Sequence, residues 1–198
     1  PPAPTFFNTK YVYRVLANVL TTGNDTVASP LSNSASGTVQ GWRVEADDKT
    51  RAYGAPNPDF TYSVIPPPPA PAPSGIITCI SNAIASSPVG SYPITCSGGA
   101  GSVWYTPGNL TITMAATTTK ITSVSPEPST PGQPVVVAFT VELASGAVLT
   151  TGGTVTVTGG GASCYGTLAA GKCELTPTVW GNITFTATYA GDGNTKIS

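Results

Sequence analysis

Apolar residues recur at every second position in several stretches, and this period restricts the fold more than any other feature. Side chains two positions apart lie on the same face of a β-strand, whereas a helix needs a spacing of 3.6 residues, which no window of the sequence sustains. We therefore expect strands and almost no helix. The alternating residues are Val135, Val137, Phe139 and Val141, then Val155 and Val157, then Ile183, Phe185, Ala187 and Tyr189.

Glycine and proline limit how long each strand is. The 198 residues include 22 glycines and 20 prolines, so the stretches that can form a core are short. Threonine beside valine, tyrosine and isoleucine favours strands, because branched and aromatic side chains pack well on a pleated surface. The composition predicts an all-β fold of small sandwich modules in tandem rather than one large core.

The charge balance excludes several classes of partner. Eight basic and nine acidic residues leave a net charge of −1, which offers no basic footprint for nucleic acid or anionic lipid. No apolar run is long enough to cross a membrane. The sequence shows no signal peptide, and we expect the chain to be a mature part of a secreted protein.

Four cysteines form two local pairs, Cys79 with Cys96 and Cys164 with Cys173, 17 and 9 positions apart. Zinc sites need closer cysteine spacing or histidine, and the chain has no histidine. We predict one disulfide within each pair, with buried free thiols as the alternative. Disulfides form in oxidising compartments, so we expect the protein to be extracellular or exposed at the cell surface.

The sequence lacks the groups that catalysis near neutral pH requires. Without histidine, acid and base chemistry would depend on carboxylates. Asp47 and Asp48 are adjacent, so on a strand their side chains would point to opposite faces. Asp192 and Asn194 could attract calcium, but the remaining ligands of a calcium loop are missing and an Asp-Gly turn explains them. We expect no enzyme activity, no cofactor and no metal.

Tryptophans and glycosylation sequons leave a binding role open. Exposed tryptophans form the platforms of carbohydrate-binding surfaces, but in small β modules they more often pack at a core end. Sequons must lie on the surface to be modified. The tryptophans are Trp42, Trp104 and Trp180, and the sequons are at Asn24, Asn109 and Asn182.

The N-terminal part carries "YRVLA" and then "SPLSNSASGTV", which resemble the last two strands of a fibronectin type III domain. The stretch Tyr11 to Val19 alternates as one strand. A full domain of that family needs about seven strands, so these two cannot build a two-sheet core alone. We interpret residues 1–41 as partial fibronectin III-like strands or as a donor segment.

Residues 42–114 resemble the MBG repeat of bacterial surface proteins. The resemblance rests on Tyr53-Gly54, Pro58, Thr61-Tyr62, Gly90, Tyr92, Ile94 and Leu110-Thr111-Ile112. Six prolines crowd residues 66–73, where fixed φ angles and missing N–H groups favour an extended polyproline segment. Because half of the marks precede these prolines and half follow, we predict a loop at 65–75 inside one module, between strands of one sheet. Its role, as a stiff loop or a recognition segment, stays open.

Residues 115–198 resemble a bacterial immunoglobulin-like repeat through "TTTKITSVSPEPSTPGQPVVVAFTVE", "GGTVTVTGG" and "GNITFTATYAGDGN". The resemblance implies one more strand, which would follow Ser198. We therefore expect an open sheet edge, which costs free energy because its backbone groups lack partners. The residues of this assembly edge are Asn182, Ile183, Phe185, Ala187 and Tyr189.

Two ways of covering this edge stay open. An extended segment from within Pro1 to Val39 of the next copy could add to the sheet, which would join copies head to tail. Alternatively, the strand follows Ser198 in a longer chain of repeats.

Both ways make the chain a link in an extracellular fibre or cell-surface stalk, with copies of itself as the expected partners. One alternative is an adhesin or carbohydrate-binding segment with glycans as ligands. The other is a set of accessory modules of a secreted hydrolase.

Overall fold

A computed structural model describes residues 9–13, 18–20, 26–28, 35–39, 41–65, 74–100 and 103–198, the first four segments by their backbone alone. The described residues form strands β1 to β17 and no helix, so the predicted all-β fold is confirmed. No helix suited to crossing a membrane occurs in this part of the chain. The chain divides into two compact units, residues 1–45, 62–78 and 96–106 in the first and residues 46–61, 79–95 and 107–198 in the second.

The N-terminal strands form two short antiparallel pairs. Strand β1 (Thr9–Tyr13) pairs with β4 (Ala35–Val39), and β2 (Asn18–Leu20) pairs with β3 (Thr26–Ala28). Of the strand expected from Tyr11 to Val19, the described residues belong to β1 and β2, and residues 14–17 lie outside the described residues. Each pair is a two-stranded sheet, as expected for strands too few to build a sandwich.

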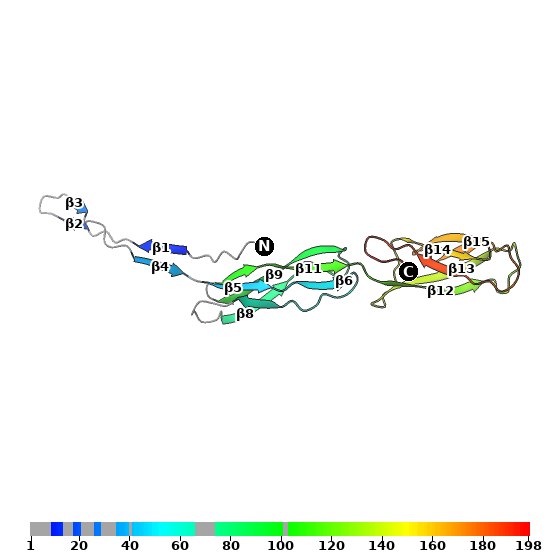
Figure 1. The fold of residues 1–198 in the computed structure, drawn as a ribbon, viewed down its shortest axis with the longest axis horizontal. Helices are drawn as coiled ribbons and strands as arrows, with labels where there is room; N and C mark the ends of the chain where they lie inside the picture. Colours follow the sequence, from blue (N-terminus) through cyan, green and yellow to red (C-terminus); the bar gives the residue numbers. More distant parts are fainter. Residues whose placement is uncertain are drawn as a thin grey trace. The chain divides into compact units, whose positions relative to one another are not determined.

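The middle module contains two sheets, and each holds one parallel pair of strands. The parallel pairs are β5 (Trp42–Ala46) with β10 (Val103–Thr106), and β6 (Lys49–Ala52) with β11 (Gly108–Thr113) (Figure 1). One sheet has the order β10, β5 and β7 (Tyr62–Ile65). The other has the order β6, β11, β9 (Gly90–Ala100) and β8 (Ser74–Ile80).

The proline run at 66–73 lies outside the described residues, but its flanking strands correct one expectation. β7 precedes the run and β8 follows it, and the two belong to different sheets rather than to one. The reason is that β7 joins β5, whereas β8 joins β9, so the chain changes sheets between them. Strands β5 and β10 pair with each other from opposite sides of the run, which supports a loop inside one module.

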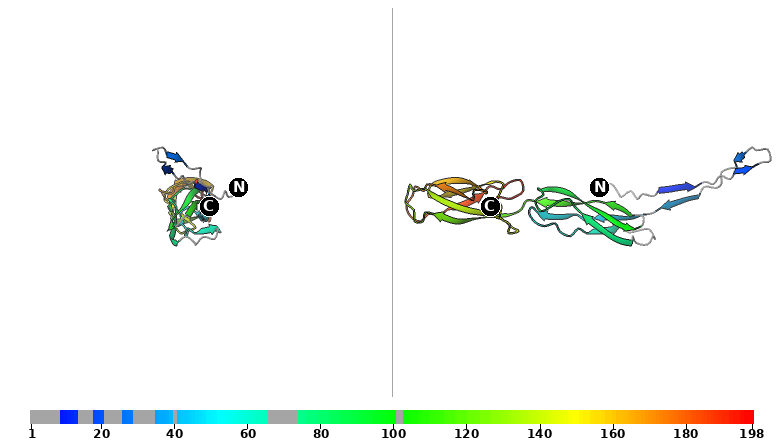
Figure 2. Two further views of the ribbon diagram at one scale, coloured as in Figure 1. Left: turned by 90° about the vertical axis from the view of Figure 1, so that its left-hand side faces the viewer. Right: turned by 180° about the vertical axis from the view of Figure 1, so that it is seen from behind.

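The C-terminal module is a sandwich of two three-stranded sheets (Figures 1 and 2). Alternate residues of β13 from Val135 to Leu143 are buried, in agreement with the period of the sequence. One sheet has the order β12 (Thr117–Ser125), β13 (Val135–Leu143) and β16 (Lys172–Leu175), and the other has the order β15 (Ala162–Thr167), β14 (Thr154–Gly159) and β17 (Thr186–Tyr189). Their inner faces share one core of Val135, Val137, Phe139, Val141, Val155, Val157, Cys164, Leu168, Cys173, Leu175 and Tyr189.

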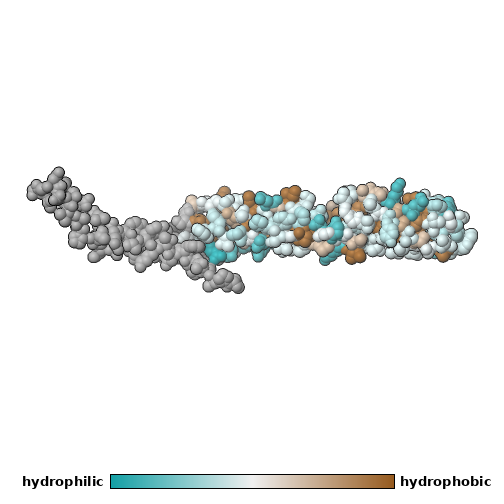
Figure 3. All heavy atoms as spheres, turned by 90° about the horizontal axis from the view of Figure 1, so that it is seen from above, coloured by the Kyte–Doolittle hydropathy of each residue, from teal (hydrophilic) through white to brown (hydrophobic). Residues whose placement is uncertain are grey.

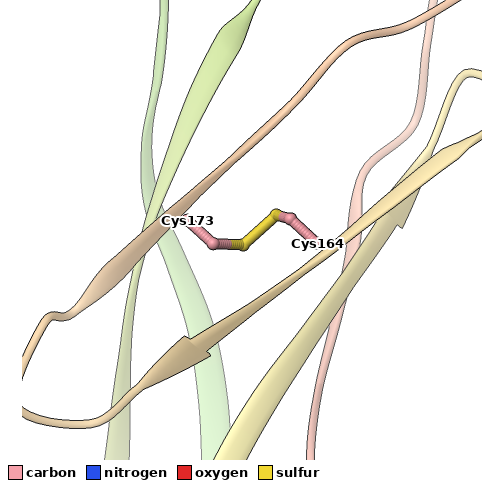
Figure 4. The surroundings of a disulfide bond; sticks show 2 residues. All are labelled: Cys164 and Cys173. Carbon is pink, nitrogen blue, oxygen red and sulfur yellow. A yellow bond between two sulfur atoms is a disulfide. The ribbon is translucent and has the colours of Figure 1, made fainter.

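A disulfide fastens the two sheets of this sandwich to each other. Cys164 on β15 and Cys173 on β16 are bonded, with 5.9 Å between their Cα atoms (Figure 4). The bond is the one predicted from their spacing, and it crosses the core instead of lying at its rim. Cys79 and Cys96 are disulfide-bonded as well, and no described cysteine is free.

Candidate functional site: the edge of the C-terminal module

Strand β17 is shorter than the alternating pattern predicts. Its ladder with β14 ends at the pair Thr158–Thr186, and β14 itself ends at Gly159. At Gly160, which has a φ of 58°, the chain turns away into β15. Residues 182–185 therefore have no strand to pair with on that side, and the prediction of a strand through Ile183 and Phe185 was wrong.

β14 pairs with one side of β17. On the other side, Ser198 pairs with Tyr189. The Tyr189 N–H donates to the carbonyl of Ser198 at 2.6 Å, and the Ser198 N–H donates to the carbonyl of Tyr189 at 3.1 Å. The expectation of an edge open along its whole length is corrected by these bonds. The sequence pattern could not show them, because Ser198 belongs to no alternating stretch.

The same terminal segment also pairs with the residues before β12. The Ala115 N–H donates to the carbonyl of Asn194 at 3.0 Å, and the Lys196 N–H donates to the carbonyl of Ala115 at 2.9 Å. Further along, the hydroxyls of Thr119 and Ser198 are 2.8 Å apart. Residues 194–198 thus lie between β12 and β17, in the place of a final strand, and their pairing with Ala115 is parallel.

A groove lies between the loop that follows β12 and the segment that leads into β17. We call it the edge groove; its volume is about 290 Å³. Four apolar side chains pack on the core here but stay half-buried, whereas Val137 and Val157 are fully buried. Those four are Ile121, Val124, Phe185 and Ala187. The edge groove is lined by Val124, Pro126, Glu127, Pro128, Ser129, Thr130, Pro131, Pro177, Val179, Trp180, Gly181, Asn182, Ile183 and Phe185.

The backbone groups of β17 alternate between the two sides of the strand. In a strand, residues two apart present their N–H and C=O groups to the same side. Tyr189 bonds Ser198 on the side of β17 that faces away from β14, so Ala187 presents its backbone groups to that same side.

The loop that returns the chain to this edge is held by Asp192. Its Oδ1 accepts hydrogen bonds from the N–H groups of Asn194 and Thr195, both at 2.8 Å, and from the Thr195 hydroxyl at 2.7 Å. Burial pushes the pKa of Asp192 upward, but these hydrogen bonds outweigh it and hold the pKa below its ordinary value. Burial also raises the pKa of Tyr189, whose hydroxyl bonds Thr195 at 2.9 Å.

This arrangement makes Asp192 the organiser of a turn. Its Oδ1 is engaged by three donors from its own loop, as the turn interpretation of the sequence expects. Within the described ranges, no group of three histidine, cysteine, aspartate or glutamate residues could hold a metal ion.

Asn194 ties this loop to the middle module, a role that its sequence did not reveal. Its side-chain oxygen accepts a hydrogen bond from the N–H of Val89 at 2.9 Å. The only signal in the sequence is an amide next to glycine in a turn, which is common to many loops. Since Asn194 also bonds Ala115 through its carbonyl, one residue connects the loop before β9 with the start of the C-terminal module.

The carboxylates considered for catalysis serve the backbone instead. Asp47 accepts the Thr61 hydroxyl at 2.5 Å, and its N–H donates to the carbonyl of Thr61 at 3.0 Å. Asp48 accepts the N–H of Asn109 at 2.7 Å. Asp47 and Asp48 lie between β5 and β6 and not on a strand, and their side chains have separate partners.

The remaining candidates are distributed over different parts of the chain. Asn109 on β11 and Asn182 beside the edge groove are both exposed, whereas Asn24 lies outside the described residues. Trp42 is half-buried, Trp104 is 58% exposed and Trp180 is 84% exposed. Trp104 belongs to the first unit and Trp180 to the second. On the face shown in Figure 3, hydrophobic residues are scattered among polar ones rather than joined in one patch.

One comparison with known families identifies part of the chain. Residues 43–118 match the family described as MBG domain (YGX type). The match confirms the resemblance seen at 42–114, while the fibronectin-like and immunoglobulin-like resemblances remain interpretations. No curated protein matches the chain.

Proposed function

We propose that this chain is a structural segment of an extracellular fibre or stalk on a bacterial cell surface. The observation that carries the proposal is a domain of a surface-associated repeat family, followed in the same chain by a second β module made of two sheets. A chain of small modules can become long because each module folds around its own small core.

The cysteines support an oxidising, extracellular location. All four are in disulfides, and the Cys164–Cys173 bond lies inside the core of its module. Such bonds stabilise small modules whose cores are limited. A stalk exposed outside the cell depends on this kind of covalent reinforcement, since it is beyond the reach of cellular chaperones.

The proposal assigns no catalytic activity, cofactor or metal to the chain. Asp47, Asp48 and Asp192 bind backbone groups and hydroxyls of their own modules. Further copies of the chain are the partners that it names, joined head to tail so that the repeat extends.

Surface display tests this function. The full chain, and a chain with the whole sequence repeated twice, are anchored on a bacterial host and carry a fluorophore at the N-terminus. Energy transfer to a dye in the membrane should fall when the sequence is doubled, because a stalk places its end farther from the cell. Equal transfer from the single and the doubled chain would contradict a spacer role.

An adhesin is the second candidate, and exposed tryptophans favour it. Trp104 and Trp180 present large aromatic surfaces to solvent, as platforms for sugar rings do. Glycan-array binding by the full chain that disappears in Trp104→Ala or Trp180→Ala would support this role. Tyr165→Ala is the matched control, because Tyr165 is also an exposed aromatic residue but lies on β15. Absence of binding by the native chain would remove the candidate.

A further inference from the structure

We propose that Trp104, Arg43, Glu45 and Thr106 form a binding site for a neutral sugar chain on the outer face of the sheet that contains β5 and β10. The proposal rests on the second candidate function and deepens it, because it names the residues of the site and the class of sugar that they bind.

The register of β5 and β10 brings the four side chains to one face. In this parallel pair Trp104 lies opposite Arg43. Two positions further along each strand, Thr106 lies opposite Glu45. Val44, between Arg43 and Glu45, is fully buried, so the side chains on either side of it point away from the core. All four residues of the site belong to the first unit.

Trp104 supplies the flat surface on which a sugar ring packs. Its side chain is 58% exposed on β10, although tryptophan is ordinarily a mostly buried residue. A sugar ring has apolar C–H groups on its faces and hydroxyl groups at its rim, and the indole ring offers an apolar face to the C–H groups. β10 is the outermost strand in the order of its sheet, so a sugar chain can pass over Trp104 without meeting another described strand.

Arg43 is held beside this surface by Thr106 and Glu45. Its Nε donates to Thr106 Oγ1 at 3.0 Å, and its Nη2 donates to Glu45 Oε1 at 3.5 Å. A guanidinium has more N–H donors than these two bonds use, and a carboxylate has further acceptor positions. The side chains of Arg43 and Glu45 are 32% and 42% exposed, so a ligand can reach both.

A fixed donor beside an acceptor matches a hydroxyl group, because a hydroxyl both accepts and donates. Sugars carry hydroxyls on neighbouring carbon atoms, so Arg43 can donate to one while Glu45 accepts from the next. Neighbouring strands lie about 4.8 Å apart, which brings the indole and the guanidinium within reach of one sugar residue. A purely apolar ligand would cover the indole but leave the donor and the acceptor without partners.

Charge favours a neutral sugar over an acidic one. Arg43 and Glu45 are the charged residues of β5 and β10, and they form an ion pair. A carboxylate on the ligand would compete with Glu45 for the guanidinium and would be repelled by Glu45 itself. The site therefore selects uncharged sugars, such as hexoses and N-acetylhexosamines.

Trp180 is more exposed than Trp104 but lacks these polar neighbours. It lies outside the strands in the lining of the edge groove, where the charged residue is Glu127. The described lining contains no cation, so no donor–acceptor pair accompanies the ring of Trp180. The two tryptophans therefore differ in what surrounds them, and a comparison between them isolates the site.

Glycan binding by the full chain and its variants tests the proposal. The probes are arrayed oligosaccharides of glucose and of N-acetylglucosamine, with oligomers of glucuronic acid as the acidic set. The native chain should bind the neutral oligosaccharides. Trp104→Ala should weaken this binding about tenfold or more, as the loss of a central aromatic contact does. Trp180→Ala is the matched control and should bind like the native protein.

Changes at the ion pair test the chemistry of the site. Glu45→Gln keeps an acceptor oxygen but leaves Arg43 without its counter-charge, so this variant should gain binding to the glucuronic acid oligomers. Arg43→Gln removes the charged donor and should weaken binding to the neutral oligosaccharides about threefold to tenfold.

Thr106 is a positioning residue, because it acts through Arg43. Thr106→Val removes the hydroxyl and should weaken binding, whereas Thr106→Ser keeps the hydroxyl and should bind like the native protein. Circular dichroism should show the native β-sheet signal in every variant, and Trp104→Leu replaces Trp104→Ala if that variant unfolds.

Binding of the neutral oligosaccharides that is unchanged in Trp104→Ala would overturn the proposal, as would a native chain that binds only the acidic oligomers. Binding that is lost in Trp180→Ala and kept in Trp104→Ala would overturn this site but leave the adhesin candidate standing. A native chain that binds no probe would remove both the site and the adhesin candidate. The stalk proposal is scored separately by surface display.

Discussion

The C-terminal module and the part of the middle module in the second unit are both built from two-residue alternation, yet they are stabilised by different interiors. In the C-terminal module, branched side chains from two sheets meet around Phe139 and a disulfide. In the middle module, a buried arginine accompanies apolar residues such as Ile94 and Leu110. Arg51 on β6 is 6% exposed, and no ion pair involves it among the described residues.

Arg51 is held by oxygen atoms of neighbouring loops. Its guanidinium donates to Asn57 Oδ1 at 2.7 Å, to the carbonyl of Ala52 at 3.1 Å and to the carbonyl of Ile84 at 2.5 Å. Asn57 in turn donates to the carbonyl of Ala83 at 2.6 Å. The comparison shows that the middle module adds one multivalent donor, which joins its loops, to an apolar core, whereas the C-terminal module depends on packing and a disulfide.

Truncation of Phe139 should cause the largest loss of stability, and the loss should be confined to the C-terminal module. Phe139→Ala leaves a cavity at the centre of an apolar core, which costs about 3 to 5 kcal/mol. Hydrogen exchange followed by mass spectrometry should show faster exchange in β14 and unchanged exchange in β11. Equal acceleration in both strands would show that the two interiors are not independent.

Loss of the core disulfide should have the next largest effect. Replacing Cys164 and Cys173 together by alanine releases a short loop in the unfolded chain and should cost about 2 to 4 kcal/mol. Chemical denaturation of the native protein and the double variant measures the difference. A midpoint unchanged by the double replacement would mean that packing alone holds the two sheets together.

Replacement of Arg51 should destabilise the middle module, by less than the two changes above destabilise the C-terminal module. Arg51→Met keeps the length of the side chain but removes the three hydrogen bonds of the guanidinium, at a cost of about 1 to 3 kcal/mol. Arg51→Lys is the matched control: it restores charge but not the planar fork, so it should recover only part of the loss. Hydrogen exchange should accelerate in β11 and in the loop before β9, not in β14. Full recovery by lysine would show that charge, not the fork, holds the loops.

The alternating residues of the sequence predicted the strands, but the sequence did not reveal the side chains that hydrogen-bond to backbone groups. The burial of Val135, Val137, Val155 and Val157 follows from their period, because packing against a second sheet selects one face. Arg51 could not be predicted, since a charged residue on a strand ordinarily lies at the surface.

The candidate edge was predicted only in part for a similar reason. Alternation located Ala187 and Tyr189 correctly, but the end of β17 depends on where β14 turns at Gly159. The pairing of Tyr189 with Ser198 could not be predicted, because Ser198 belongs to no alternating stretch. Local periods therefore predict which residues face the core, while the limits of a sheet are decided by partners distant in the sequence.

The loop of Asp192, which connects the two modules through Asn194, should contribute the smallest change in stability. This contribution depends on pH. Asp192 orders the loop that places Asn194 against Val89, and its folded pKa lies below its ordinary value of 3.8. A carboxyl group with a depressed pKa contributes stability that is fully present above its unfolded pKa and is lost as the pH falls through the folded one. Stability of the C-terminal module should therefore decline as the pH falls from about 4 toward the lower folded value.

The variant Asp192→Asn makes this pH dependence measurable. Asparagine keeps an oxygen acceptor for the turn but cannot ionise, so the variant should lose about 1 kcal/mol or less at neutral pH. Its stability between pH 5 and pH 3 should be flatter than that of the native protein, as followed by denaturant titrations at each pH. Asp192→Ala removes the acceptor too and should release Val89 from Asn194, visible as faster exchange of the Val89 amide. An equally steep decline in Asp192→Asn would assign the acid sensitivity to other carboxylates and leave the turn a purely local feature.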